Sequence, residues 1–197
     1  MTAPNVHRRD FLRSMAAAGS AVTVGGLTAA CADPSAPTVP RAGPLARTIT
    51  VRSIAALQTA INSAAAGDEI VVADGTYLNN SINVSTSGIV VRAATPGGVF
   101  LHGTNAITIS ANRVVFSGFQ FTSGSIAGVI ITVTGSDNLL TQLNVNGYSA
   151  QKYISIQAPS QRNQISYSNF ENKPPNAPSG NLVHVEADAT VPGYHRI

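Results

Sequence analysis

Hydrophobic and polar residues recur in a fixed order every 24 or 25 residues along the second half of the chain. Three segments, 116–121, 140–145 and 165–170, each read apolar, Ser or Thr, two variable residues, Gln or Asn, then apolar. Val91 lies one period upstream, and the last residues, 194–197, begin another such unit. A fixed period of this length is typical of a solenoid, in which each repeat stacks on its neighbours to bury its apolar face.

Short β-branched segments separated by Gly, Asn, Ser and Pro follow residue 67, and this pattern favours strands. A single amphipathic helix is predicted over 54–66, with Ser53 as its N-cap and Gly67 beyond its end. It is placed to cover the open N-terminal end of a solenoid. Strands are predicted at 48–52, 67–77, 82–84, 88–93, 99–102, 106–109, 114–121, 129–133, 139–145, 153–157, 164–170 and 182–186.

The predicted fold is all-β: a right-handed parallel β-helix with an N-terminal capping helix, truncated at its C-terminal end inside a rung. A leucine-rich repeat has a similar period, but its spaced leucines and asparagine motif are absent. A β-sandwich is the remaining alternative, although it does not predict a positional repeat. We expect the C-terminal end to expose strand edges and core, so that the chain associates or unfolds readily.

Three regions are predicted: an export leader at 1–31, a Pro-rich linker at 32–47 and an incomplete β-helix domain at 48–197. Arg8 and Arg9 precede Phe-Leu and a mildly apolar stretch, which resembles a twin-arginine signal read by the bacterial export machinery. The stretch is too short and too rich in Gly and Ala to predict a membrane span. We therefore expect an exported protein.

Cys31, the single cysteine, follows Leu27–Ala30, which resembles a lipoprotein processing box. Lipidation of Cys31 would make the mature protein a membrane-anchored lipoprotein. Ordinary cleavage after Ala32 is the alternative, and it would leave a periplasmic protein. In both cases a disulfide within the mature chain is excluded, so stability must come from stacking and burial.

Composition and charge narrow the possible partners. Apolar residues make up 44% of the chain and charged residues 11%, with Ser, Thr, Asn and Gln as the main polar residues. Of the formal net charge of +3, the leader carries +2. The rest of the chain carries only +1. It also contains no Lys/Arg run or basic patch of the kind that binds nucleic acid.

Four stretches resemble polysaccharide lyase family 6, which includes chondroitinase B and alginate lyases. Val51–Tyr77 is similar to the family's opening, with its helix, Gly-Asp-Glu-Ile-Val-Val and Asp-Gly-Thr-Tyr. Val99–Gly103 fits the next rung, and Phe170 with Lys173 fits a Phe-x-x-Lys segment. Pro192–Ile197 is similar to a stretch in the central rungs. The resemblance spans roughly residues 48–197.

The resemblance implies eliminative cleavage of an acidic, uronate-containing polysaccharide, either alginate or dermatan or chondroitin sulfate. Such a reaction removes the C5 proton, so the neighbouring carboxylate must be neutralised and a base must take the proton. The family attributes these roles to Ca²⁺ held by Asn and acidic side chains, a Lys base and an Arg acid. These groups are expected on rungs beyond Ile197, so no catalytic or metal-binding residue is assigned in this chain. Alone, it is expected to be inactive.

Two cations remain as candidate substrate contacts. Lys173 begins a long excursion, 173–180, where a cation could meet a uronate, and Arg196 lies in the last segment. The alternatives are an exposed loop lysine and a turn entering a strand. A noncatalytic β-helix that binds glycan or serves as a surface scaffold is the second functional hypothesis.

Other polar residues have structural interpretations. Period 2 places His184 and Glu186 on one strand face, near Asp188, where a solvated surface is the alternative to a metal site. Asn144 and Asn169 are predicted to take part in an amide ladder between rungs. Acidic residues beside glycine turns are expected to be structural, namely Asp68, Glu69 and Asp74.

Overall fold

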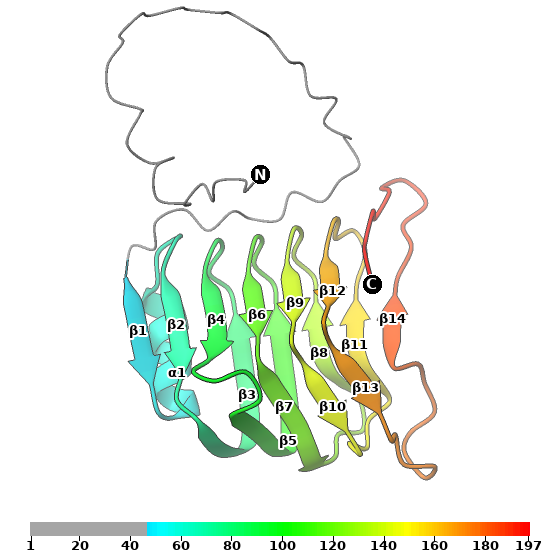
Figure 1. Ribbon diagram of the computed structural model, residues 1–197. Coiled ribbons are helices and arrows are strands. Elements are labelled where there is room, and N and C mark those ends of the chain that lie inside the picture. The colour runs from blue at the N-terminus through cyan, green and yellow to red at the C-terminus, as the bar shows by residue number, and fades with distance from the viewer. Residues whose placement is uncertain (1–46) are drawn as a thin grey trace, which may run out of the picture. The chain divides into compact units, whose positions relative to one another are not determined.

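The structure is a computed structural model that describes residues 47–197 (Figure 1). The predictions for Arg8, Arg9 and Cys31 lie outside the described residues. The elements are β1 (Thr48–Val51), α1 (Ile54–Ser63), β2 (Glu69–Val72), β3 (Gly75–Val84), β4 (Val90–Ala93), β5 (Val99–Ile109), β6 (Val115–Ser117), β7 (Phe119–Gly124), β8 (Val129–Val133), β9 (Leu139–Thr141), β10 (Asn144–Asn146), β11 (Lys152–Ile156), β12 (Gln164–Ser166), β13 (Asn169–Glu171) and β14 (Val183–Val185).

One sheet contains six parallel strands in the order β1, β2, β4, β6, β9 and β12. Val91 pairs with Phe116, Phe116 with Leu140, and Leu140 with Ile165, so the period read from the sequence is the register of this sheet. Arg196 forms a parallel bridge to Gln164 and starts the next rung. The predicted parallel β-helix with a capping helix is therefore confirmed.

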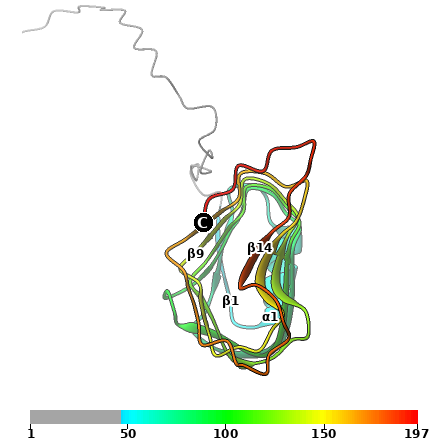
Figure 2. The ribbon, with the colours of Figure 1, turned by 90° about the vertical axis from the view of Figure 1, so that its right-hand side faces the viewer.

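The other sheet is folded around a corner into two limbs because its longest strands, β3 and β5, run through that corner. The first part of β5 pairs with β7, and its last part, Ile107–Ile109, pairs with β8. One limb continues through β10 and β13, and the other through β11 and β14. Figure 2 shows the rungs end-on, with β9 and β14 on opposite sides of the stack.

Most of the residues with a left-handed backbone in the described part of the chain form three columns, one at each corner of the rungs. Their φ angles are positive, a conformation that most L-residues avoid. The column leading into the six-stranded sheet contains Gly67, Gly88, Arg113, Asp137, Arg162 and Tyr194; the column leading out of it contains Gly118, Gln142 and Tyr167; the column between the limbs contains Asn79, Gly103, Ser123, Gly147 and Asn172.

The corners correct the predicted strand boundaries. The strands expected at 114–121, 139–145 and 164–170 are each two strands, because a left-handed residue interrupts them. Conversely, the separate strands expected at 99–102 and 106–109 are the single strand β5, which passes its corner with only a register shift.

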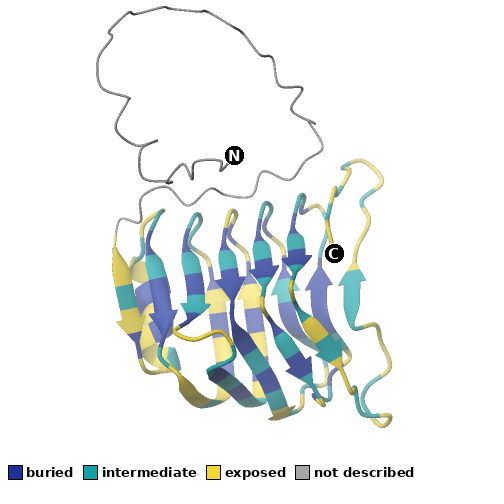
Figure 3. Cartoon of the chain, in the orientation of Figure 1, coloured by how far each residue is buried: buried dark blue, intermediate teal, exposed yellow. Residues whose placement is uncertain are grey.

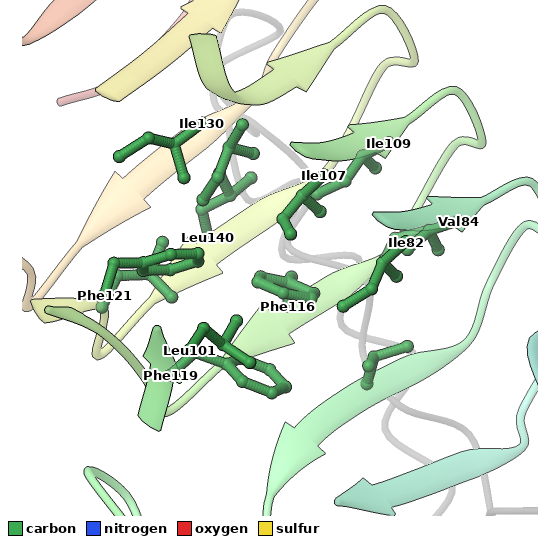
Figure 4. Close-up of a cluster of buried hydrophobic side chains, with 14 of the residues drawn as sticks. Ile82, Val84, Leu101, Ile107, Ile109, Phe116, Phe119, Phe121, Ile130 and Leu140 are labelled. Carbon is green, nitrogen blue, oxygen red and sulfur yellow. The ribbon is translucent and has the colours of Figure 1, made fainter. Parts of the chain in front are cut away.

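The core is a continuous apolar column inside the rungs. Inward residues of successive strands stack on one another, as Ile82, Ile107 and Ile131 do, and all three are buried. Phe116 and Phe119 stack with ring centroids 4.4 Å apart. Figure 4 shows these rings beside the aliphatic side chains of neighbouring strands. A single rung could not bury these side chains, so each repeat is stable only when it stacks on its neighbours.

Helix α1 closes the N-terminal end. The Ser53 hydroxyl accepts a hydrogen bond from the Ala56 N–H at 3.1 Å, as predicted for the N-cap. The Gln58 side chain donates to the Asn83 carbonyl and accepts from the Asn83 N–H, at 3.0 and 2.8 Å. One amide therefore satisfies both free backbone groups of an edge residue in β3. The helix ends at Ser63, earlier than the predicted residue 66, because Ala64 has extended dihedrals.

Tyr148 links two rungs that are not adjacent. Its hydroxyl donates to the Gly103 carbonyl at 2.6 Å and accepts from the Asn105 N–H at 2.9 Å. The residue is fully buried, and burial raises the pKa of Tyr148, so the hydroxyl stays protonated as a donor. The ring passes Gly124 of the intervening rung, where a Cβ atom would overlap the Gly103 carbonyl oxygen.

The C-terminal end is more exposed than the rungs beneath it (Figure 3). Val185 is 39% exposed, although Ile156, which pairs with it one rung earlier, is fully buried. Ile197 is 72% exposed. Apolar residues at core positions are thus partly exposed at this end, as expected from the sequence. Within residues 47–197, no helix has the length and apolar character needed to cross a membrane.

Candidate functional site

The two cations singled out by the sequence lie apart, Lys173 in the loop after β13 and Arg196 beside β12. Lys173 follows β13, and its ammonium group donates to the carbonyls of Gln151 and Gly180, at 2.9 and 3.0 Å. Arg196 pairs through its backbone with β12, and its side chain is exposed. Lys173 therefore closes its own loop onto the previous rung, whereas Arg196 extends outward from the six-stranded sheet.

His195 differs from its two neighbours in the Tyr194–Arg196 segment. Its Nδ1 accepts the Asn163 N–H at 3.1 Å, and its Nε2 is buried without a partner. One rung earlier, Asn163 Oδ1 accepts the Asn138 N–H at 2.9 Å in the same way. His195 thus occupies a position that asparagine fills in the preceding rungs, and this role is structural.

The burial of His195 predicts a pH-dependent C-terminal segment. Burial lowers the pKa of His195 below its ordinary value of 6.5, so the unfolded chain binds the proton more readily than the folded chain. The segment's stability is therefore present above about pH 6.5 and is lost as pH falls through the folded-state pKa. We expect hydrogen-exchange protection of the Asn163 amide to decrease over this range, after correction for the intrinsic exchange rate.

His195→Asn is the matched control, because asparagine supplies the same kind of acceptor in the earlier rungs and does not titrate. Protection of the Asn163 amide should then be flat across the acidic range. An equal pH dependence in both proteins would show that another group causes it.

The three acidic residues near the first turns are all engaged by neighbours, in agreement with their structural interpretation. Asp68 accepts from the Arg47 guanidinium at 2.8 Å and from the Ala65 N–H at 2.9 Å. Hydrogen bonding, first of all from Ala65, lowers the pKa of Asp68. Glu69 pairs with Arg92, and Asp74 accepts the Thr95 N–H at 3.0 Å.

The side chains of His184, Glu186 and Asp188, which the sequence suggested as a metal site or a solvated surface, do not meet at one point. His184 and Glu186 share the outer face of their strand, with His184 Nε2 4.0 Å from Glu186 Oε1. Asp188 is held within its own turn, because Oδ1 accepts from the Thr190 N–H and hydroxyl at 2.7 and 2.6 Å. In the described part of the chain, no group of three or more His, Cys, Asp or Glu side chains could hold a metal ion. These residues do not fit Ca²⁺, which takes six to eight oxygen ligands.

Amide side chains connect rungs on the outer face of β7 and β10. Asn144 Nδ2 donates to Gln120 Oε1 at 3.1 Å, which forms one step of the predicted ladder. The next rung is reached two residues further along the strand, where Asn146 Nδ2 donates to the Glu171 carboxylate at 2.8 Å, and not through a side-chain bond between Asn144 and Asn169. Asn169 pairs with Asn144 through the backbone register.

Two further polar pairs were missed by sequence reasoning. Arg162 forms a two-pronged ion pair with Asp137, at 2.6 and 2.8 Å, which raises the pKa of Arg162. His102 Nε2 and Thr122 Oγ1 lie 2.9 Å apart on the outer face of β5 and β7. Asp137 and Arg162 are one period apart in the sequence. Opposite charges at equivalent positions of adjacent repeats could therefore have predicted this ion pair.

Comparison with known proteins gives one family and several structures. The chondroitinase B family matches residues 51–197. The structure is similar to the PL6 family alginate lyase AlyGC, with a TM-score of 0.54 and 22% identity, over 60% of this chain and 18% of that one. It is also similar to a PL6 family polysaccharide lyase from Pseudopedobacter saltans, with a TM-score of 0.57 and 21% identity, over 72% of this chain and 43% of that one. No curated protein sequence matches.

These structures share the fold with this chain. The chain spans 18% of the length of AlyGC and 43% of the length of the Pseudopedobacter saltans protein. Most of each lyase therefore has no counterpart in residues 47–197.

Proposed function

The chain belongs to the chondroitinase B family, and on that premise we propose that it forms the N-terminal part of an exported polysaccharide lyase. Its substrate is a uronate-containing polysaccharide of the alginate or dermatan sulfate type, cleaved by β-elimination. The family match over residues 51–197 is the observation that carries the proposal. The fold shared with two polysaccharide lyases supports it.

In this proposal the described residues build the scaffold and bind substrate. The Lys173 ammonium already donates to the carbonyls of Gln151 and Gly180, which suits a residue that fixes the 173–180 loop. The exposed guanidinium of Arg196 suits a carboxylate or sulfate on the glycan. Neither residue is assigned to proton transfer. Ca²⁺, when present in a complete lyase, would neutralise the uronate carboxylate, and we assign it no ligand here.

The test is incubation of the full chain with alginate and with dermatan sulfate. We expect retention of the chain on immobilised glycan, and no rise in the ultraviolet absorbance of unsaturated uronate products. Release of such products would show that the catalytic groups lie within this chain. Absence of both binding and cleavage would contradict the proposal.

A noncatalytic glycan-binding or scaffold protein is the second candidate. It is favoured by the amide and hydroxyl pairs on the outer face of β5, β7 and β10, which present polar groups without a convergent acid and base. The two candidates are distinguished by measuring glycan cleavage after this chain is mixed with the remaining rungs of a related lyase. Restored cleavage supports the lyase, whereas binding without cleavage supports the scaffold.

Export is the second part of the proposal. The Arg8-Arg9 pair and the residues before Cys31 motivate it. Cys31→Ser is expected to move the protein from the membrane fraction to the soluble periplasmic fraction, because the lipid acceptor is lost. Replacing both Arg8 and Arg9 by Lys should retain the precursor in the cytoplasm. Membrane association that is unchanged in Cys31→Ser would rule out the lipid anchor.

A further inference from the structure

Tyr167 is the most exposed of the large hydrophobic side chains in residues 47–197. It is 91% exposed and lies where the last complete rung leaves the six-stranded sheet. Its side chain therefore gains almost nothing from burial in this chain. An exposed aromatic residue of this kind calls for an explanation other than packing.

The backbone makes tyrosine an unfavourable choice at this corner. Tyr167 has a φ of 47°, in the left-handed region that bulky residues avoid. The same corner is occupied by Gly118 and Gln142 in the two preceding rungs, so the fold does not require an aromatic ring here. Strain without a packing benefit is the pattern expected of a functional position.

A second tyrosine has the same properties at the opposite corner. Tyr194 has a φ of 50° and is 54% exposed, and it follows Asp137 and Arg162 in its column. Among the described non-glycine residues with positive φ, the two tyrosines are the only aromatic ones. They bracket the six-stranded sheet on adjacent rungs. The five residue steps from Arg162 to Tyr167 correspond to a length of about 16 Å along an extended strand.

Between the two rings, the outward residues of β9 and β12 are Leu139, Thr141, Gln164 and Ser166, so this surface is polar apart from one leucine and carries no acidic side chain. Ile165 points into the core, so Gln164 and Ser166 on either side of it face outward. The Ser166 hydroxyl donates to Thr141 Oγ1 at 3.1 Å, which places a second hydroxyl on the preceding rung. Amides and hydroxyls recognise sugar hydroxyl groups, whereas aromatic faces pack against the C–H face of a pyranose ring. A nucleic acid is disfavoured because no basic cluster is present.

We propose that Tyr167 and Tyr194 are the two stacking ends of a glycan-binding platform on the outer face of β9 and β12. Gln164 and Ser166 bind hydroxyl groups between them. The platform takes several consecutive sugar rings of a polysaccharide and holds the chain without acting on any bond. This inference rests on the proposed function, because it assumes a polysaccharide ligand.

The test compares the full chain with Tyr167→Asn and Tyr167→Phe. Binding of alginate and dermatan sulfate oligosaccharides is measured by calorimetry, and stability by urea denaturation. Asparagine tolerates the left-handed conformation, so Tyr167→Asn should unfold at an equal or higher urea concentration. It should nevertheless bind about three- to tenfold more weakly, because one stacking contact is lost. Tyr167→Phe should bind within about twofold of the original chain, since the ring is kept.

Leu78→Asn is the matched control, because Leu78 is also exposed but lies on β3, away from the platform. Its affinity for glycan should not change. Equal affinity of Tyr167→Asn and the original chain would overturn the platform while leaving the proposed function in place. If the original chain binds neither glycan, the proposed function and the platform both fail.

Discussion

Gly124→Ala is expected to lower the free energy of unfolding by about 3 kcal/mol or more. The added Cβ would overlap the Gly103 carbonyl oxygen and approach the Tyr148 ring to 2.5 Å, and neither group can move aside. The Gly103 carbonyl is fixed by the Tyr148 hydroxyl and by the Ser125 N–H. Urea denaturation followed by circular dichroism measures the loss.

Gly128→Ala provides the control in the same rung, because nothing lies within 4 Å of the added Cβ. Its φ is not in the left-handed region, so the substitution should be neutral or stabilise the chain by up to about 1 kcal/mol. If Gly124→Ala were tolerated as well as Gly128→Ala, the close packing of three rungs at Tyr148 would be wrong.

Tyr148→Phe is expected to reduce the free energy of unfolding by about 2–3 kcal/mol. The ring volume is kept, but the buried Asn105 N–H loses its 2.9 Å acceptor and cannot reach water. The Gly103 carbonyl loses one donor and keeps the Ser125 N–H. Urea denaturation should show a lower midpoint with an unchanged slope.

Tyr77→Phe is the comparison, because the partly buried Tyr77 hydroxyl makes one hydrogen bond, to the Ala73 carbonyl at 2.7 Å. We expect a loss of about 1 kcal/mol there. Equal losses in both variants would mean that the Asn105 N–H finds another acceptor when the Tyr148 hydroxyl is removed.

Much of the fold could be predicted because the spacing of apolar residues in the sequence equals the register of the strands. Val91, Phe116 and Leu140 point into one core, so their recurrence locates one wall of the rungs. The positions of the corners were harder to predict from the sequence, because a left-handed backbone does not require glycine. Arg113, Gln142 and Tyr167 all have this conformation. Strand boundaries at corners therefore had no clear residue signal.

Contacts that skip a rung could not be predicted from the period. Tyr148 reaches residues 43 and 45 positions earlier, past a glycine that leaves room for its ring. Likewise, the sequence alone does not distinguish His195 from its neighbours Tyr194 and Arg196. The inward direction of the His195 side chain becomes clear only from the rungs below it. There Asn163 accepts a backbone N–H of the preceding rung, as His195 accepts the Asn163 N–H.

The Gln58 amide occupies the place that a further strand would take beside Asn83 of β3. Its two hydrogen bonds satisfy the N–H and the carbonyl of that residue, which β5 leaves free on the outer edge of the strand. Free backbone groups at a sheet edge are a template for pairing with another chain. A single glutamine of the capping helix thus blocks this position of β3 against strand addition by a second molecule.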